Sequence, residues 1–315
     1  MGVCNDGRLL AVLFLCFLWP LNVYGKDCSQ WQLSQRINGQ QLWQDLSVLS
    51  ADEMQGRKAG NNQLSRDYIA SRFQQIGLLP FSDTYLQTFN YKRSGELNIG
   101  VNVVGMVPSA LGLQKYIVIT AHYDHLGIRG RHIYNGADDN ASGVAALLAL
   151  AQVAKQTPLN YGLIFVATDA EETGLYGAKA FVDDSPVPLE QIRLSLNLDM
   201  IAYSGQRKRL YLASAKADKG LKPIVEYAVE HASVCLVAGH NGVTRNYNNT
   251  GKIDWRASSD HAVFKRAEIS YLFFSVNDHR YYHTENDTID NINPTFYQAV
   301  VESILTTLAF AAESL

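Results

Sequence analysis

Short apolar runs alternate with amphipathic segments along most of the chain. The apolar runs predict strands at Val101–Pro108, Lys115–Thr120, Leu163–Ala167, Leu194–Leu198, Leu210–Ala213 and Tyr271–Val276. Apolar residues at helical spacing predict helices at Asn61–Gly77, Ser142–Lys155, Gly174–Val182, Gly220–Ala232 and Pro294–Ala312. Strands that alternate with helices are typical of a largely parallel sheet that helices cover on both faces. The pattern therefore predicts an α/β fold.

Three stretches have no clear period. Asp27–Asp52 is polar with scattered apolar anchors, and Leu78–Gly100 is irregular or strand-like. Gly239–Trp255 is rich in Gly and Asn, which predicts a long surface loop, either a plain linker or the wall of a pocket. No repeat or low-complexity linker marks a domain boundary, so we expect residues 26–315 to form a single domain.

The first 25 residues are typical of a secretory signal peptide. Arg8 precedes the apolar run Leu9–Leu18, and Val23–Gly25 offers a cleavage site. The run is short for a membrane span, and an uncleaved N-terminal anchor is the alternative. No other stretch is expected to be long and apolar enough to span a bilayer. We therefore expect an exported protein, periplasmic or extracellular, with no stable membrane span after signal cleavage.

Composition and cysteine usage add two constraints. A hydrophobic content of 47%, a charged content of 18% and a net charge of -3 describe a globular chain and give no case for nucleic-acid binding. Cys4 and Cys16 lie in the signal peptide, which leaves Cys28 and Cys235. In an exported protein this pair could form a disulfide that ties the N-terminus to the domain.

Imidazoles and carboxylates follow the predicted strands. In an open α/β sheet the ligand site lies beyond the carboxyl ends of the strands. The polar residues that follow the strands, or lie in the next loop, are His122, Asp124, His125, Asp138, Asp139, Glu171, Glu172, Asp199, Tyr281, Tyr282 and His283. Segments that are far apart in the sequence would thus bring these side chains to one region.

This mixture of His, Asp and Glu, without Cys, suits zinc or a similar divalent ion in a catalytic site. Buried carboxylates are costly unless they meet a cation or a donor. These segments offer more ligands than one zinc with an open position needs, whereas a carboxylate that bridges two metal ions about 3.5–4 Å apart would use them all. The residues therefore favour a two-metal site.

Five short motifs occur in a fixed order, namely His122–Asp124 (HYD), Gly136–Gly143 (GADDNASG), Ala170–Gly174 (AEETG), Asn197–Asp199 (NLD) and Tyr282–Thr284 (YHT). Their order and spacing resemble those of the co-catalytic dizinc aminopeptidase family, whose relatives include glutaminyl cyclases and glutamate carboxypeptidase-like enzymes. The resemblance extends from about Gly56 to the C-terminus. It implies a three-layer α/β/α fold with a central mixed, mostly parallel sheet.

The resemblance also implies a ligand set for two zinc ions per chain. Asp139 corresponds to the carboxylate that bridges both ions. His122 and Asp199 complete one site, and Glu172 and His283 complete the other.

Three catalytic roles are implied in the same way. Glu171 is the general base in hydrolysis by a water that the two zinc ions activate. Because neighbouring residues point in different directions, Glu172 can bind metal while Glu171 stays free for proton transfer. Asp124 is the acid that orients the imidazole of His122, and Tyr282 polarises the substrate carbonyl.

Other polar residues have structural interpretations. We expect Asp138 to support the site or cap a helix, because Asp139 occupies the matching position. Ser259–His261 is interpreted as structural support near the pocket. Loop or surface positions are expected for His125, His132, His231 and His240. A serine hydrolase is disfavoured because the sequence has no G-x-S-x-G elbow.

Three functions remain open. The first is an exported dizinc aminopeptidase that removes N-terminal residues from peptides with a free N-terminus, with Glu171 and Asp199 near the amine. The second is a glutaminyl cyclase with one zinc, and the third is a non-catalytic binding protein on the same scaffold. Asp139–Gly143 and Glu171–Gly174 favour the dizinc enzyme, and the complete ligand set argues against the binding protein.

Overall fold

The computed structural model describes residue 2 and residues 28–215, 219–247 and 251–315. The predicted signal peptide lies, apart from Gly2, outside the described residues. The helices are α1 (Gly39–Leu49), α2 (Gln63–Ile76), α3 (Gly143–Gln156), α4 (Tyr176–Asp183), α5 (Lys222–His231), α6 (His261–Arg266) and α7 (Pro294–Ser314). The strands are β1 (Leu79–Pro80), β2 (Leu86–Arg93), β3 (Glu96–Val107), β4 (Tyr116–His122), β5 (Gly127–Arg129), β6 (His132–Tyr134), β7 (Gly162–Thr168), β8 (Ile192–Leu198), β9 (Arg209–Ser214), β10 (Cys235–Ala238), β11 (Val243–Arg245), β12 (Lys252–Asp254) and β13 (Tyr271–Ser275).

A single mixed sheet runs through the molecule in the order β1-β3-β7-β4-β8-β13-β9-β10, with β2 paired to β3. The central strands β7, β4, β8 and β13 are parallel. Antiparallel pairs occur toward the edges, between β3 and β7 and between β13 and β9. Parallel neighbours place their carboxyl ends along one edge of the sheet, which is where the polar motifs emerge.

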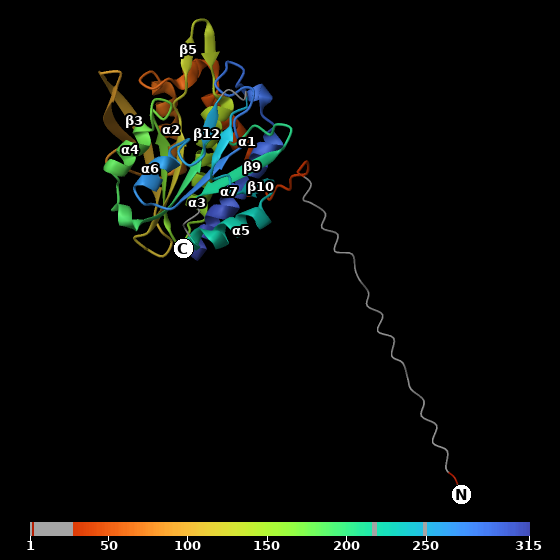
Figure 1. Cartoon of the computed structure of the whole chain (residues 1–315). Helices are drawn as coiled ribbons and strands as arrows, with labels where there is room; N and C mark the ends of the chain where they lie inside the picture. Colours follow the sequence, from red (N-terminus) through yellow and green to blue (C-terminus); the bar gives the residue numbers. More distant parts are fainter. Residues whose placement is uncertain (1, 3–27, 216–218, 248–250) are drawn as a thin grey trace.

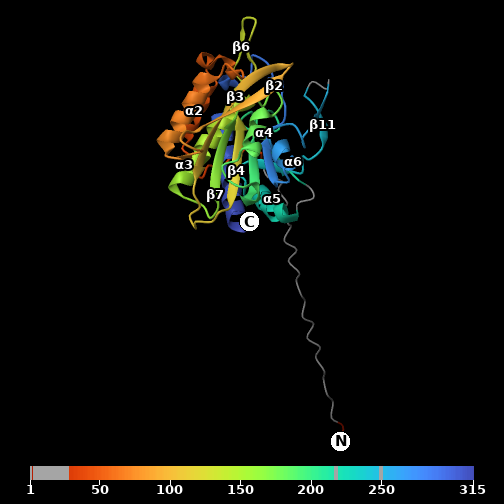
Figure 2. The ribbon, with the colours of Figure 1, turned by 90° about the vertical axis from the view of Figure 1, so that its left-hand side faces the viewer.

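Helices cover both faces of this sheet (Figures 1 and 2). Alternate residues of β4 serve the two layers, because Ile117 and Ile119 enter one core and Val118 enters the other. The larger core packs the sheet against α1, α2, α3, α5 and α7, and the smaller packs it against α4 and α6. The prediction of a three-layer α/β/α fold with a mixed, mostly parallel sheet is confirmed.

The structure adds elements that the apolar pattern did not reveal. The polar stretch before residue 52 contains α1, which buries Leu42, Leu46 and Leu49 and begins at Asn38, whose side chain accepts a hydrogen bond from the Gln41 amide. Gly239–Trp255 is not one irregular loop, because it contains the antiparallel pair β11–β12. Another antiparallel pair, β5–β6, projects from the end of the molecule opposite the C-terminus (Figure 1).

One expectation about membrane spans needs correction. Helix α7 is long and apolar enough to cross a membrane by length and composition, with a mean hydropathy of 1.2 in its most apolar window. However, 72% of that window is buried inside the molecule. Its buried side chains, which include Phe296, Val300 and Ile304, belong to the larger core. We therefore assign α7 as a core helix.

The N-terminal segment is fastened to the domain. Cys28 and Cys235 form a disulfide across 207 residues. This confirms the pairing predicted for the two cysteines that lie outside the predicted signal peptide. A few residues later, the Glu302 carboxylate on α7 accepts hydrogen bonds from the amides of Ser34 and Gln35. The segment before α1 is thus held at two points, one on β10 and one on α7.

Candidate metal centre

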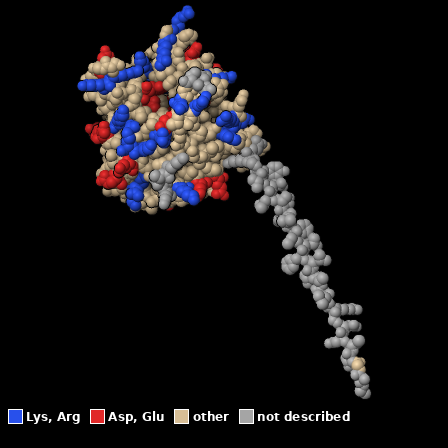
Figure 3. Space-filling model, viewed as in Figure 1, with Lys and Arg blue, Asp and Glu red and all other residues tan. Residues whose placement is uncertain are grey.

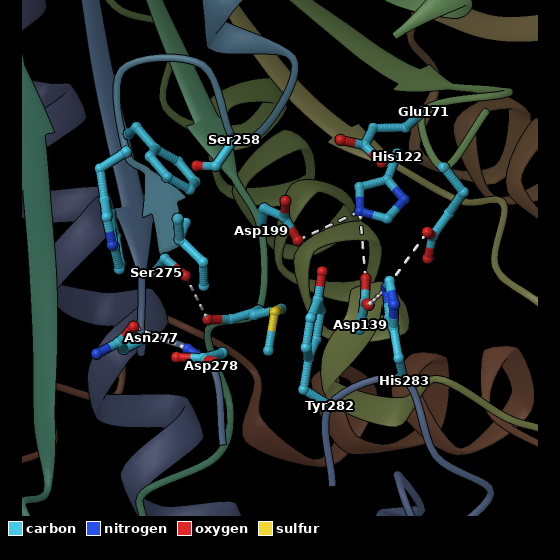
Figure 4. Close-up of a pocket in the computed structure, with 15 residues that line it drawn as sticks. His122, Asp139, Glu171, Asp199, Ser258, Ser275, Asn277, Asp278, Tyr282 and His283 are labelled. Carbon is cyan, nitrogen blue, oxygen red and sulfur yellow. Dashed lines mark hydrogen bonds and ion pairs between the residues drawn. The ribbon is translucent and has the colours of Figure 1, made fainter. Parts of the chain in front are cut away.

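The predicted ligands converge at the carboxyl ends of the parallel strands. His122 ends β4, Asp199 follows β8, and Glu171 and Glu172 lie in the turn between β7 and α4. Asp139 lies in the turn that leads into α3. His283 is carried by the loop between β13 and α7, where its φ of 57° is left-handed. All the predicted metal ligands therefore meet at one end of the sheet (Figure 4).

A first cluster is formed by His122, Glu171 and Asp199. The Nε2 atom of His122 lies 3.2 Å from Asp199 Oδ1 and 3.4 Å from Asp139 Oδ1. His122 is 2% exposed and Asp199 is 8% exposed. Both are borne by neighbouring core strands, so the sheet itself sets their separation.

A second cluster surrounds the other carboxylate oxygen of Asp139. The Nε2 atom of His283 lies 3.2 Å from Asp139 Oδ2 and 3.3 Å from Glu172 Oε2. His125 also belongs to this cluster, because its Nδ1 atom lies 2.9 Å from Glu172 Oε1 and 3.7 Å from Asp139 Oδ2. Asp139 thus faces one cluster with each oxygen, as a shared carboxylate requires.

The donor set fits divalent metal ions. It consists of imidazole nitrogens and carboxylate oxygens. Ligand atoms of His122, Glu171 and Asp199 lie within 4.8 Å of one another, and so do those of His125, Asp139 and Glu172. His125 Nε2 is buried and has no hydrogen-bond partner among the described residues, and buried Asp139 Oδ2 makes no well-aligned hydrogen bond, although His283 Nε2 lies 3.2 Å from it. Buried polar atoms without partners are costly, and a bound cation would satisfy the carboxylate oxygen. The structure therefore contains two candidate metal sites that share Asp139.

Two buried aspartates hold the backbone of this centre. The Asp124 carboxylate accepts hydrogen bonds from the amides of Glu171 (2.9 Å) and Glu172 (3.3 Å). The Asp287 carboxylate does the same for the amides of Asp138 and Asp139, each at 3.0 Å. Asp124 and Asp287 thereby fix the directions in which both pairs of acids point.

Asp124 contacts the imidazole of His122 in a way that the sequence did not specify. The Nδ1 atom of His122 donates to the backbone carbonyl of Asp124 over 3.1 Å, whereas the Asp124 carboxylate lies 3.7 Å away. The carbonyl is therefore the closer orienting group. The carboxylate contributes charge to the imidazole and hydrogen bonds to the glutamate turn.

The two adjacent glutamates have opposite electrostatic environments. Burial raises the pKa of Glu171 well above its ordinary value; the charge of His122 opposes this effect and that of Asp199 adds to it. Burial also favours protonation of Glu172, but hydrogen bonds from His125 and His283 outweigh it and hold its pKa well below the ordinary value. Adjacent titratable groups whose pKa values are pushed apart are typical of separate roles. Here Glu172 has the properties of a fixed anion and Glu171 those of a proton acceptor.

A pocket opens over the two clusters. The metal-binding candidates and Tyr282 form one end of it, and burial raises the pKa of the Tyr282 phenol above its ordinary value. In Figure 3, acidic side chains lie in a hollow on the face shown, while Lys and Arg gather around it. Ile253 and Trp255 also line the pocket, so part of Gly239–Trp255 forms a wall and is not a plain linker.

The remaining polar predictions have mixed outcomes. Asp138 supports the site, because its Oδ1 atom accepts from the Ala202 and Tyr203 amides and its Oδ2 atom lies 3.0 Å from His279 Nε2. Ser259 accepts a hydrogen bond from Asn197, and His261 Nε2 donates to the Trp255 carbonyl over 2.9 Å.

The other histidines differ in how far they follow the prediction. His132 and His231 are exposed, and His240 is half-buried against Trp255. Tyr281 packs edge-on against Tyr203 and does not line the pocket.

Sequence reasoning missed two buried residues, Asp287 and His279, and assigned a third, His125, no role in the metal centre. His125 lies in a loop as expected, but it is only 2% exposed and contacts Glu172. Its position three residues after His122 was the available signal. Asp287 and His279 follow no strand directly and lie in an irregular loop, so neither periodicity nor motif spacing identified them.

Comparison with known proteins agrees with this geometry. A family model described as peptidase family M28 matches residues 102–308, which is more than half of the 315-residue chain. The chain belongs to peptidase family M28. The resemblance to dizinc aminopeptidases that the five motifs suggested is thereby confirmed.

Curated relatives are distant. The chain is 28% identical over 237 residues to the alkaline phosphatase isozyme conversion protein of Escherichia coli, a match that covers 69% of this chain and 66% of that protein. It is 28% identical over 202 residues to aminopeptidase YwaD of Bacillus subtilis, covering 61% of this chain and 40% of that protein. The matches thus span less than two thirds of either relative's own length.

Solved structures share the fold. The zinc aminopeptidase BSAP from Bacillus subtilis superposes with a TM-score of 0.70 at 18% identity, over 87% of this chain and 95% of that one. A glutaminyl cyclase from Porphyromonas gingivalis gives a TM-score of 0.66 at 17% identity, over 88% of this chain and 100% of that one. Both similarities concern the fold.

Proposed function

We propose that this M28 peptidase is an exported dizinc aminopeptidase that removes N-terminal residues from peptides. The observation that carries the proposal is the pair of His/Asp/Glu clusters that share Asp139 at one end of a pocket. Asp139, His122 and Asp199 would hold one zinc ion, and Asp139, Glu172 and His283 the other. Export is supported by the Cys28–Cys235 disulfide, because such bonds persist in oxidising compartments.

Zinc in such a site supplies Lewis-acid polarisation and lowers the pKa of water toward neutrality. The chain's own residues supply proton transfer. Glu171 accepts a proton from the attacking water, whose oxygen bonds to the carbonyl carbon of the first peptide bond. Glu171 then delivers that proton to the nitrogen of the leaving peptide as the C–N bond breaks, so no net proton is gained or lost.

Other side chains position the reacting groups. Asp124 holds the amides of Glu171 and Glu172, so the two carboxylates diverge from one fixed turn. Tyr282 lines the pocket beside His283, on which its ring stacks with centroids 3.8 Å apart. Its phenol is protonated at neutral pH, because its pKa is raised, and it can donate a hydrogen bond to the substrate carbonyl oxygen.

The test is a substrate panel combined with metal analysis. We expect the purified chain to hydrolyse aminoacyl anilides with a free amine but not the same compounds with an acetylated amine. Removal of metal by 1,10-phenanthroline should abolish turnover, and zinc should restore it at about two ions per chain.

Other outcomes would redirect the assignment. Cyclisation of N-terminal glutamine with about one zinc per chain would identify a glutaminyl cyclase. Cleavage of blocked substrates would indicate a carboxypeptidase or endopeptidase. If zinc-loaded protein turned over no member of the panel, a non-catalytic binding protein would be the better interpretation.

A further inference from the structure

The pocket extends well beyond the candidate metal ligands. Its walls include four large apolar side chains, namely Met200, Ile253, Trp255 and Phe273. Trp255 is 2% exposed, packs on Phe273 with ring centroids 5.5 Å apart, and donates from Nε1 to Thr244 Oγ1 over 3.0 Å. These contacts fix the indole, so this part of the pocket has a preformed apolar wall.

A carboxylate outside the two metal clusters also lines this pocket. The pocket is lined by Phe273 and Ser275, which lie on the same side of β13, and by Asn277, which follows that strand. Asn277 has a left-handed φ of 77°, and the turn brings the next residue, Asp278, into the lining as well. Figure 4 shows Asp278 well separated from Glu171 and His122. Asp278 is therefore an acid of the pocket that belongs to neither metal cluster.

The charge of Asp278 is only partly compensated. Its Oδ2 atom accepts a hydrogen bond from the Tyr247 amide. Burial raises its pKa above the ordinary value, and the Tyr247 hydrogen bond and the nearby His279 oppose that shift. The described residues that line the pocket include no Lys or Arg. A cationic group brought beside Asp278 would offset the remaining desolvation cost.

We propose that Asp278 is a specificity-determining residue that selects peptides whose N-terminal residue is Lys or Arg. The proposal rests on the proposed aminopeptidase function, in which the scissile carbonyl lies at the metal ligands and the first side chain lies against the apolar wall of the pocket. The apolar walls accommodate the methylene stem of such a side chain. The aromatic rings of Trp255 and Phe273 add a favourable surface for the cation on its way to the carboxylate.

Asp278 also accepts a hydrogen bond from Tyr247, which follows β11. A suitable variant must therefore remove the negative charge of Asp278 and keep this hydrogen bond. Asp278→Asn retains a carbonyl oxygen that can accept from the Tyr247 amide but removes the charge. Asp254→Asn is the matched control. Asp254 adjoins Ile253 and Trp255, yet it does not line the pocket and its carboxylate pairs with Arg256 at 2.7 Å.

The experiment compares lysyl and norleucyl 4-nitroanilides on the zinc-loaded protein. Norleucine has an unbranched apolar side chain like the lysine stem but lacks the ammonium group. We expect the native chain to prefer lysine in kcat/KM by about tenfold or more, as a charge-assisted contact predicts. Asp278→Asn should lose that preference mainly through slower lysyl turnover, and Asp254→Asn should keep it.

Binding of the free amino acids gives a readout that is independent of turnover. Calorimetry should show L-lysine binding about tenfold tighter than L-norleucine to the native protein but not to Asp278→Asn. If the native chain processes norleucyl substrate as well as lysyl substrate, or Asp278→Asn keeps the preference, the proposal is overturned while the aminopeptidase function stands. If no anilide is hydrolysed, the proposed function fails, and equal binding of the two amino acids would then overturn the Asp278 assignment as well.

Discussion

The two candidate metal sites are built from different kinds of structure. In the first, His122 ends β4 and Asp199 follows the adjacent parallel strand β8, and their side chains are 2% and 11% exposed. In the second, His283 comes from an irregular loop, and its side chain is 36% exposed. The first site is thus determined by the sheet, whereas the second depends on how the loop after β13 is held. We expect the second site to bind and release its ion more readily.

The largest effect is expected at Glu171, which could act either as a metal ligand or as the general base. Glu171 lies within ligand distance of His122 and Asp199, yet its environment is that of a proton acceptor. Glu171→Gln should lower kcat by about 10²–10⁴-fold while both zinc ions remain. Activity on a leucyl anilide and metal content are measured on the same sample. Loss of one ion would instead make Glu171 a ligand of the strand-borne site.

The next largest effect is on zinc affinity, which we expect to differ between the two sites. His122→Ala and His283→Ala should each weaken one zinc site by at least about 100-fold, since even outer-shell changes cost 10–100-fold. Stepwise chelation should show that the native chain loses the His283 ion first. If both sites of the native chain bind zinc with equal affinity, the position of a ligand at a strand end or in the loop after β13 does not decide how tightly the ion is held.

A smaller effect is expected at His125. Its Nδ1 atom contacts Glu172, whereas Nε2 has no partner among the described residues. If His125 only orients Glu172, His125→Ala should weaken the second site by about 10–100-fold and leave the first unchanged. Complete loss of the second ion, with His283→Ala retaining it, would exchange the roles of the two histidines.

The last prediction concerns the free energy of unfolding, and it leaves turnover and zinc affinity at neutral pH unchanged. His261 stacks on Phe273, and burial lowers its pKa to about 3. Because the unfolded chain binds the proton near pH 6.5 and the folded chain does not, the stability that neutral His261 supports is present above that pH. It is lost between about pH 6.5 and 3, at about 1.4 kcal/mol per pH unit.

His261→Gln removes this titration and can still donate to the Trp255 carbonyl. Denaturant unfolding at several pH values should therefore show a shallower decline in the free energy of unfolding for the variant. Parallel curves for the two proteins would show that His261 does not titrate in this range.

The same contrast explains what the sequence could predict. Strands β4 and β7 are mostly apolar, and β8 alternates apolar with polar residues. The ends of all three carry short motifs, so their positions and the acids that follow them could be read directly. The loop after β13 offered only His283 within a motif. Its supports, Asp287 and His279, act across about 140 residues on Asp138 and Asp139, and no local pattern encodes such contacts.

Helix α1 escaped prediction for a related reason. Its apolar residues Leu42, Leu46 and Leu49 have helical spacing, but the surrounding glutamines lower the overall apolar signal. The pair β11–β12 consists of short strands in a Gly- and Asn-rich segment, where turn residues dominate the composition. In both cases tertiary packing, more than local propensity, decides the structure.

The two-point attachment of the segment before α1 has a practical consequence for preparing the protein. In a reducing cytoplasm the Cys28–Cys235 bond would not persist. The segment before α1 would then be held by its hydrogen bonds to Glu302 and by the packing of Trp31 against Phe296. Material made in that way would differ from disulfide-bonded material in a segment that does not line the pocket. The rates of heat inactivation and proteolysis would then depend on whether the Cys28–Cys235 disulfide had formed, and not on how tightly the metal centre binds its ions.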